Sequence, residues 1–564
     1  SNLSLTKDGT LINFIYDNTG GAKDYTLALG STGIIELNGD KATGIAASVN
    51  GLAPANKVTI KNEGTIITTS GNKIVGIFSK GANVENTASA KIDIGANGIG
   101  IYTTNNGADS NTALTNKGEI ILSGDEAIGI LANKPNTTQS FVGGKITGTK
   151  DTLTGIYVKE SEALTNVKDF TISLGTHAKG LVFDKGKDFT VNTTSANNKI
   201  TIGDTLDKTK RGIGIAAIET GGTIEKTDVL VGTDSLGLYA KGKEVEFKTG
   251  MLKSSTGSSI LAYADKKATI KLNTGPFEIA KNGLAIGANG GKIETDTVTT
   301  IEVKGEKGIG AFVVGDATDA GSISDKFEVK VKNDGGIGVY TKGKVTSFAK
   351  VKEIKGNHSK GYIFDNLADA ATISDVLQLQ DSNATGQIGI YAMGTGAGIT
   401  TKGISVMGFG NIGLYNQVNQ NLTNNGILTV TDSTSDKNSI GIYSDNRNES
   451  TTVRTITTKD AITVGKNSVG IYGKNIGIAQ TLASKDITVD EKGIGLLTEN
   501  TAEYYGKGNI SVSGNLQVKD KGAVGIQASN ADISVKGLTV GAEDSKGIYS
   551  TEKGNITVSD DINV

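Results

Sequence analysis

Two segments of this 564-residue chain have the spacing of a phosphate-binding loop. They run from Gly237 to Lys243 and from Gly338 to Lys344, and both fit G-x-x-x-x-G-K. In such loops the backbone amides surround the phosphates, and a following Ser or Thr holds Mg²⁺ where a helix begins. Here Glu244 and Val345 take that last position, and no helical pattern follows. We therefore interpret both segments as turns and expect no nucleotide site.

Residues that could form a metal or nucleophilic site are scarce. The chain has no cysteine and only two histidines, which excludes cysteine-ligated metal and a disulfide framework. His177 and His358 each stand three residues before a glycine of one repeated motif, Gly180 and Gly361, and we interpret both as turn residues. No G-x-S-x-G sequence supports a Ser-His-Asp triad. We expect no metal, no cofactor and no catalytic residue.

Paired carboxylates remain the enzymatic alternative. Glycoside hydrolysis needs two of them about 5–9.5 Å apart beside the scissile bond. Asp and Glu are numerous but scattered over expected turns, and only three arginines are present to bind an acidic sugar. A polysaccharide lyase or hydrolase is therefore kept as the alternative, and we expect a protein that is not an enzyme.

A glycine-centred motif of the type Gly-Ile-Gly-Ile-Tyr returns along the whole chain. The 503 residues from Gly44 to Gly547 contain 19 intervals of about 26.5 residues, a period typical of repeat architectures. Clear copies are centred on Gly44, Gly76, Gly100, Gly129, Gly155, Gly237, Gly338, Gly389, Gly413, Gly441, Gly470 and Gly547. Weaker copies are assigned to Gly180, Gly214, Ser259, Gly283, Gly310, Gly361, Gly495 and Gly525.

Within each repeat the apolar residues alternate with polar ones. Ile92-Asp-Ile94, Ile462-Thr-Val464 and Ile487-Thr-Val489 are examples, and Asn-Gly or Lys-Gly pairs separate such runs. Alternation with β-branched residues indicates half-buried strands, and Gly and Asn suit turns with positive φ. A propeller needs longer repeats, and left-handed β-helices have a more uniform spacing. The sequence therefore predicts an all-β right-handed parallel β-helix of about twenty rungs, with almost no helix.

The repeated motif also predicts which side chains form the core. If alternation continues through the glycine, the aliphatic residues on either side of it share the inner face, and the tyrosines two positions after it share the outer face. The expected core residues are Ile99, Ile101, Ile128, Ile130, Ile440, Ile442, Val469, Ile471, Ile487 and Val489. The expected outer tyrosines are Tyr102, Tyr157, Tyr239, Tyr340, Tyr391, Tyr415, Tyr443, Tyr472 and Tyr549. We interpret this stripe as a structural ladder.

Candidate binding residues were sought in repeats longer than the mean, because function on a regular scaffold tends to lie in irregular loops. The longest gaps are Gly180–Gly214, Gly44–Gly76 and Gly495–Gly525. The first contains Arg211, and the third contains the paired aromatics Tyr504 and Tyr505. Exposed tyrosines and arginine suit sugar stacking or a protein contact. Tyr504, Tyr505 and Arg211 are the predicted ligand-binding residues.

The charge balance, 57 basic against 59 acidic residues, argues against nucleic acid as a partner. The longest apolar stretches, such as Ile213–Ile218, are far shorter than the roughly 18 residues of a membrane-spanning helix. We expect a monomer that does not insert into a membrane.

The glycine motifs resemble those of a known family. Together with Asn62-Glu-Gly-Thr-Ile66, Asn116-Lys-Gly-Glu-Ile120 and the composition poor in Arg and Cys, they are similar to the passengers of large fusobacterial autotransporter adhesins. The resemblance covers nearly the whole chain from about Gly44. It implies type V secretion, display at the outer membrane on the cell surface, and attachment to other bacteria or host cells through glycans or surface proteins. No site residue carries over, because the shared motifs are structural.

These observations together give the expected organisation. Residues 1–43 are expected to form irregular N-terminal rungs or a cap, and residues 44–564 a continuous repeat array, truncated at its C-terminus and without a translocator barrel. The expected function is an adhesin passenger whose partner is a glycan or protein receptor on a host or bacterial surface. The alternatives are the carbohydrate-active enzyme and a passive spacer that carries a binding tip elsewhere.

Overall fold

In a computed structural model of the chain, the described residues are 2–17, 23–50, 58–105, 112–135, 141–193, 196–255, 257–394, 396–417, 421–445, 455–474, 477–480, 486–499 and 508–564. They form two compact units, Ser1–Thr299 and Thr300–Val564. The only helix among these residues is the three-residue 3₁₀ helix η1 (Lys208–Lys210). The expected all-β class is confirmed.

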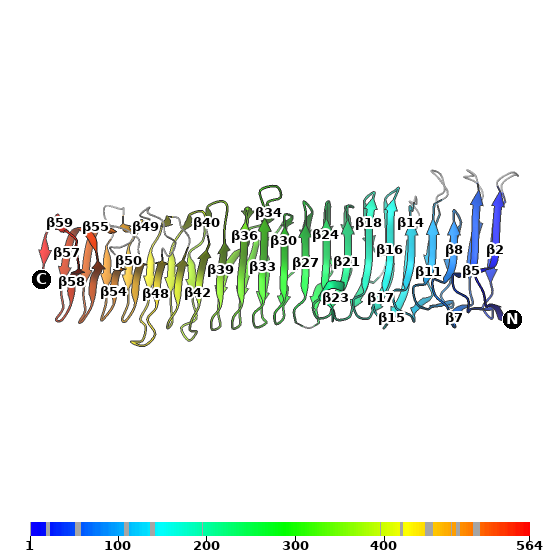
Figure 1. The fold of residues 1–564 in the computed structure, drawn as a ribbon, viewed down its shortest axis with the longest axis horizontal. Coiled ribbons are helices and arrows are strands. Elements are labelled where there is room, and N and C mark those ends of the chain that lie inside the picture. Colours follow the sequence, from blue (N-terminus) through cyan, green and yellow to red (C-terminus); the bar gives the residue numbers. More distant parts are fainter. Residues whose placement is uncertain are drawn as a thin grey trace. The chain divides into compact units, whose positions relative to one another are not determined.

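Each unit is a right-handed parallel β-helix whose turns follow one another in chain order (Figure 1). A turn has three strands: the anchor strand with the repeated glycine, the trailing strand after it, and the leading strand before the next anchor. Each strand pairs in parallel with its counterpart in the neighbouring turn, as β8 pairs with β11 and β7 with β10. The number of turns is close to the expected twenty.

The strands of the first unit fall into these three classes. The anchor strands are β2 (Gly9–Asp17), β5 (Ala42–Asn50), β8 (Val75–Lys80), β11 (Ile99–Thr104), β14 (Ile128–Asn133), β16 (Thr154–Ser161), β18 (Lys179–Gly186), β21 (Ile213–Ile218), β24 (Leu236–Lys241), β27 (Ile260–Asp265) and β30 (Leu284–Asn289). The trailing strands are β3 (Tyr25–Leu29), β6 (Val58–Asn62), β9 (Asn83–Asn86), β12 (Leu114–Asn116), β19 (Phe189–Asn192), β22 (Gly222–Ile224), β25 (Glu244–Phe247), β28 (Thr269–Leu272) and β31 (Lys292–Glu294). The leading strands are β1 (Asn2–Leu5), β4 (Ile34–Leu37), β7 (Thr65–Thr68), β10 (Lys91–Ile94), β13 (Glu119–Leu122), β20 (Asn198–Ile202), β23 (Thr227–Val231), β26 (Leu252–Ser254) and β29 (Phe277–Ile279). Two long strands serve as both trailing and leading strand, β15 (Phe141–Gly148) and β17 (Thr165–Leu174).

The second unit repeats the arrangement. Its anchor strands are β33 (Ile309–Gly315), β36 (Ile337–Gly343), β39 (Lys360–Asp365), β42 (Ile388–Met393), β45 (Ile412–Asn416), β48 (Ile440–Asp445), β51 (Val469–Lys474), β54 (Ile494–Glu499), β56 (Val524–Ser529) and β58 (Lys546–Thr551). Its trailing strands are β34 (Gly321–Ile323), β37 (Val345–Ser347), β40 (Ala371–Ile373), β43 (Ile399–Thr401), β46 (Leu422–Asn424), β49 (Thr455–Thr458), β52 (Gly477–Gln480) and β59 (Ile556–Val558). Its leading strands are β32 (Thr299–Val303), β35 (Phe327–Val331), β38 (Lys350–Ile354), β41 (Leu377–Leu379), β44 (Ile404–Val406), β47 (Leu428–Val430), β50 (Ile462–Val464), β53 (Ile487–Val489) and β60 (Ile562–Asn563). The long combined strands are β55 (Gly508–Val518) and β57 (Ala531–Val540).

The first 43 residues, expected as irregular rungs or a cap, contain β1 to β4. These strands stack in register on the next turn: β1 pairs with β4, and β2 pairs with β5 through Thr10↔Thr43 and Ile12↔Ile45. The register places Leu11 in the position that glycine holds in the later anchor strands.

Alternation is interrupted at the repeated glycine. In β11 the glycine and the following residue, Gly100 and Ile101, are both buried, whereas Ile99 and Tyr102 on either side are half-buried. A Cβ on Gly100 would lie 2.6 Å from the carbonyl oxygen of Gly129 in the next turn, so the close stacking of the two backbones leaves no room for a side chain. The inner face therefore takes two consecutive residues at this point.

This interruption corrects part of the predicted core. Ile101, Ile130, Ile442, Ile471, Ile487 and Val489 are fully buried, and Val469 is nearly so. Ile99, Ile128 and Ile440 precede their glycines and are only half-buried, on the same outer side as the tyrosines. The parity argument failed for these three because it assumed that alternation continues through the glycine.

Two weak anchors were also assigned wrongly. The strand registers place Leu261 and Ala285 in the glycine position, since Tyr239 pairs with Tyr263 and Ala262 pairs with Ile286. Ser259 and Gly283 lie two residues earlier. Both correct positions are buried and hold a small or apolar residue, so the slot accepts more than glycine where neighbouring turns make room.

A left-handed corner precedes each anchor strand by a fixed distance. The residue three positions before the glycine position has φ between 51° and 65° at most non-glycine sites, including His177 (51°) and His358 (56°). The interpretation of both histidines as turn residues is confirmed.

The Asn-x-Gly elements do a different job from the one expected. Asn62, Asn86 and Asn116 have no positive φ, and their side chains are completely buried. The Nδ2 of Asn62 donates to Oδ1 of Asn86 at 2.7 Å, and Nδ2 of Asn86 donates to Oδ1 of Asn116 at 2.7 Å. Asn116 in turn donates to the carbonyl oxygen of Gly143. We call Asn62, Asn86 and Asn116 the asparagine ladder; it joins four successive turns of the first unit.

Candidate functional site

The outer side of the anchor strands carries a column of aromatic side chains in the second unit. Tyr391, Tyr415, Tyr443 and Tyr472 come from successive anchor strands, with ring centroids 4.9–5.3 Å apart. The rings are tilted by 31° to 57° and cover one another. Because their faces are occupied by neighbouring rings, they stabilise the sheet as cross-strand pairs. The ladder interpretation agrees with this geometry.

The tyrosine hydroxyls bond to polar residues near the ends of the anchor strands. Tyr472 donates to Glu499 at 2.6 Å and Tyr340 to Asp365 at 2.6 Å, in each case in the next turn. In the first unit Tyr157 donates to Asp184 at 2.8 Å in the same manner. Burial of the ring, together with the neighbouring Asp365, raises the pKa of Tyr340 to about 12. These hydroxyls therefore stay protonated at neutral pH and hold successive turns together.

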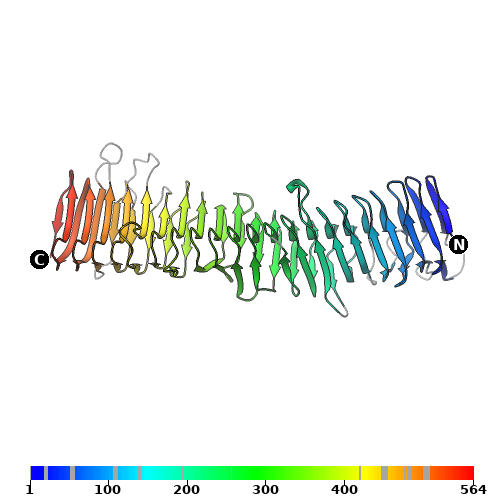
Figure 2. The same ribbon diagram turned by 90° about the horizontal axis from the view of Figure 1, so that it is seen from below.

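Arg211 lies between β20 and β21, in the segment with the largest insertion. Asp207 caps η1 by accepting from the backbone N–H of Thr209 at 2.9 Å, and Arg211 follows the helix with φ −55°. This segment is the short teal coil that leaves the strands in Figure 2. Arg211 is half-buried and lies outside any strand, three residues before Gly214.

His177 attaches this segment to the β-helix. Its Nδ1 donates to the carboxylate of Asp151, and its Nε2 accepts from the backbone N–H groups of Leu206 (2.9 Å) and Asp207 (2.7 Å). The hydrogen bond from His177 lowers the pKa of Asp151, which keeps that carboxylate ionised. The imidazole is therefore a structural bridge from a left-handed corner to the inserted loop.

Replacing His177 by alanine is expected to release the loop and leave the strands intact. Loss of the two bonds to Nε2, each contributing about 0.5–1.5 kcal/mol, should speed hydrogen exchange at Leu206 and Asp207 roughly tenfold or more. His358→Ala is the matched control, because His358 occupies the same left-handed position and its ring has no recorded hydrogen bond to the described residues. Equal exchange rates in the parent and in His177→Ala would show that the imidazole does not hold the loop.

Tyr504 and Tyr505, the other predicted binding residues, lie outside the described residues. The structure therefore does not bring them together with Arg211.

The two loop-like G-x-x-x-x-G-K segments are strands that end in tight turns. Gly338 lies in β36, which ends at Gly343 with φ 71°, and Gly237 lies in β24, which is followed by Gly242 with φ 87°. Lys342 pairs with Asp365 at 3.1 Å. The interpretation of both segments as turns is confirmed.

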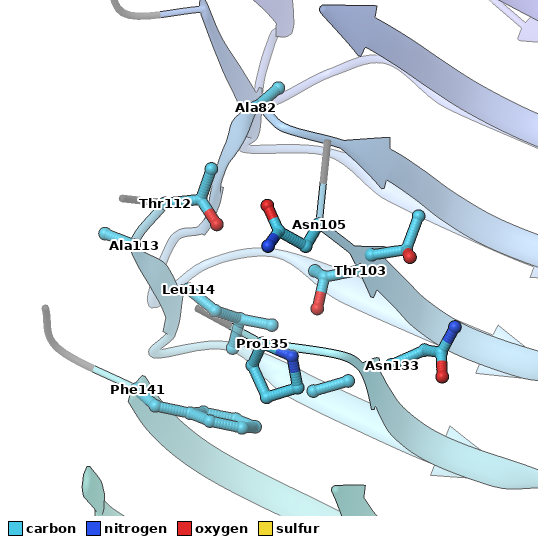
Figure 3. Close-up of a pocket in the computed structure, with 11 residues that line it drawn as sticks. Ala82, Thr103, Asn105, Thr112, Ala113, Leu114, Asn133, Pro135 and Phe141 are labelled. Atoms are coloured by element: carbon cyan, nitrogen blue, oxygen red, sulfur yellow. The ribbon is translucent and has the colours of Figure 1, made fainter. Parts of the chain in front are cut away.

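A small hollow lies beside the ends of β11 and β14 in the first unit (Figure 3). Leu114, Pro135 and Phe141 are grouped along one side of it, and Asn105 and Asn133 face it from the anchor strands. Its volume is about 20 Å³, which admits about one water molecule. It is too small for a ligand.

A larger recess in the second unit, which we call the corner pocket, lies where trailing strands turn into leading strands. Residues of three successive turns line it, among them Asp325, Ser347, Phe348, Lys350, Thr372 and Asp375, and its volume is about 300 Å³. Two residues join β37 to β38, whereas three residues form the corresponding corner in the turns on either side. The shorter corner is therefore set back between its neighbours.

The sheets are interrupted at the corner pocket. The pairing of β34 with β37 and that of β35 with β38 both shift register. Between residues 309 and 394, all of which are described, no pairing joins β37 to β40 or β38 to β41, although the anchor strands β36, β39 and β42 pair continuously. Tyr362 stands inside, where most turns have an aliphatic residue, and its hydroxyl accepts from the N–H of Val351 at 2.7 Å.

Sequence reasoning missed this pocket. The spacings do contain a signal, because Gly338 and Gly361 are 23 residues apart while the intervals before and after are 28. The prediction of binding residues rested only on repeats longer than the mean.

Within the described residues, no group of His, Asp and Glu is arranged to hold a metal ion, and no helix is long and apolar enough to cross a membrane. Comparison of the chain with protein-family models, with curated proteins and with solved structures gave no match.

Proposed function

We propose that this protein is the passenger of a bacterial cell-surface adhesin, which attaches the cell to other bacteria or to host cells. The observation that carries the proposal is the outer face of the anchor strands. In turn after turn of the second unit this face offers an aliphatic side chain before the glycine and a tyrosine after it, as at Ile412 and Tyr415. A repetitive surface of this kind suits contact with large surface molecules.

The composition and the resemblance support the same proposal. A chain without cysteine and with balanced charge can be exported unfolded, and its glycine motifs are similar to those of autotransporter passengers. The β-helix adds turns without needing a larger core, so it can extend a binding surface by repetition.

Competition with cell attachment tests the proposal. Purified 564-residue chain, added in excess, is expected to reduce attachment of bacteria that display this protein by at least about half, because free and displayed copies would occupy the same receptors. An unrelated β-rich protein of similar charge is the control. If the chain does not compete at any concentration, it acts as a spacer and the binding site lies elsewhere.

One observation favours an enzyme as the second candidate. Asp432 and Asp490 line a shallow hollow of about 390 Å³, and burial followed by the charge of Asp520 raises the pKa of Asp490. A carboxyl group with a raised pKa beside a second carboxylate is the arrangement of a glycosidase acid. New reducing ends released from host glycans by the parent, and not by Asp490→Asn, would establish this candidate; no release by the parent would reject it.

A further inference from the structure

We propose that the corner pocket binds one neutral sugar residue of a surface glycan. This inference deepens the proposed adhesin function and rests on it, since it gives the class of ligand and the place of contact. It is carried by the pocket's shape, its aromatic base, its hydroxyl-rich lining and its charge.

The size and the base of the pocket suit a sugar ring. The volume of about 300 Å³ lies at the lower end of the range of small-molecule clefts, about 300–1,000 Å³. Phe348 is half-buried and is held from below by Tyr362 and Phe364, with ring centroids 5.9 Å and 5.6 Å away. The aromatic cluster thus forms a rigid platform on which the apolar C–H face of a pyranose can pack.

The polar lining suits hydroxyl groups. Ser347, Thr346, Thr372 and Ser374 supply hydroxyls that both donate and accept, and a sugar hydroxyl does the same. Because β37 and β40 are not paired, their facing edges add backbone N–H and C=O groups to this lining.

The charges favour a neutral ligand over an acidic one. The lining contains two carboxylates, Asp325 and Asp375, against one ammonium group, Lys350. Lys350 pairs with Asp325 at 3.1 Å, and Asp375 pairs with Lys352 at 2.7 Å. Both carboxylates remain available as acceptors through their other oxygens, whereas a sialic acid or a phosphate would meet excess negative charge.

Thr372→Arg is the variant that closes the pocket. Thr372 is exposed on the pocket wall, and a long side chain there should fill the recess without entering the core. Thr400→Arg is the matched control, because Thr400 pairs with Thr372 one turn further on and lies outside the pocket. Both variants should keep the stability of the parent to within about 0.5 kcal/mol, as is usual for surface changes.

Saturation-transfer NMR with the whole 564-residue chain tests the proposal, using glucose, galactose, mannose and N-acetylgalactosamine as probes and N-acetylneuraminic acid as the acidic comparison. We expect at least one neutral sugar to bind in the millimolar range, with affinity reduced at least about tenfold in Thr372→Arg and unchanged in Thr400→Arg. Binding that survives in Thr372→Arg, no binding of any neutral sugar, or stronger binding of N-acetylneuraminic acid would each overturn it.

The attachment assay separates this inference from the function on which it rests. If Thr372→Arg competes with cell attachment as well as the parent does, the pocket is not the contact site although the adhesin function holds. If the parent binds a neutral sugar in the NMR experiment yet never competes with attachment, the pocket stands and the adhesin function fails.

Discussion

Replacing Ile442 by aspartate is expected to unfold the second unit, whereas the same change at Ile440, two residues earlier in β48, should leave it folded. Ile442 is completely buried and pairs with Leu414 and Ile471 in the neighbouring turns. A carboxylate there has no partner, and its burial costs several kcal/mol in addition to the roughly 1.5–3 kcal/mol lost with the isoleucine side chain. Ile440 lies half-buried on the outer side of the same strand, so a carboxylate at that position would keep contact with water.

Denaturant unfolding followed by circular dichroism measures the difference. We expect Ile442→Asp to lose at least about 4 kcal/mol and Ile440→Asp about 1 kcal/mol. Local hydrogen exchange in β45, β48 and β51 should accompany the global measurement, since a solenoid can open around one damaged turn. Equal losses at the two positions would mean that alternation continues through Gly441 and that the interruption at the glycine is wrong.

The fold itself was predictable because each strand carries its own signal. A run such as Ile462-Thr-Val464 alternates strictly, and its burial in the structure alternates in the same way. The spacing of the glycines then fixes the length of a turn, and the left-handed corner three residues earlier fixes where the anchor strand begins. Local pattern and overall architecture agree here, so little beyond periodicity was needed.

The features that escaped prediction depend on contacts between turns. Gly100 was taken as one step of an alternating strand, but its role is set by the carbonyl of Gly129, which is 29 residues away in sequence. The corner pocket arises because a short turn stands between two longer ones, so no single repeat contains it. The position of Arg211 outside any strand was foreseen, whereas the bridge from His177 to its loop was not, because nothing in the sequence links residue 177 to residue 206.

Removing the middle member of the asparagine ladder should destabilise the first unit by about 2–6 kcal/mol. In Asn86→Ala the Nδ2 of Asn62 loses its acceptor and the Oδ1 of Asn116 loses its donor. Both groups are completely buried, and a buried polar group left without a partner costs about 1–3 kcal/mol. The matched control is Asn13→Ala in β2, where the asparagine is exposed and should contribute no more than about 0.5 kcal/mol.

An isosteric change separates lost hydrogen bonds from lost volume. Asn86→Asp keeps the shape of the side chain, but an ionised carboxylate cannot donate to Oδ1 of Asn116, and it brings a charge into a buried position. We therefore expect Asn86→Asp to be at least as unstable as Asn86→Ala at neutral pH, and to recover part of the loss near pH 4, where protonation removes the charge and restores a donor. If Asn86→Asp is as stable as the parent at neutral pH, the ladder does not hold the turns together. In that case the glycine two positions after each of Asn62 and Asn116, where a Cβ would press against backbone carbonyls of the preceding turn, would be the feature that the motif preserves.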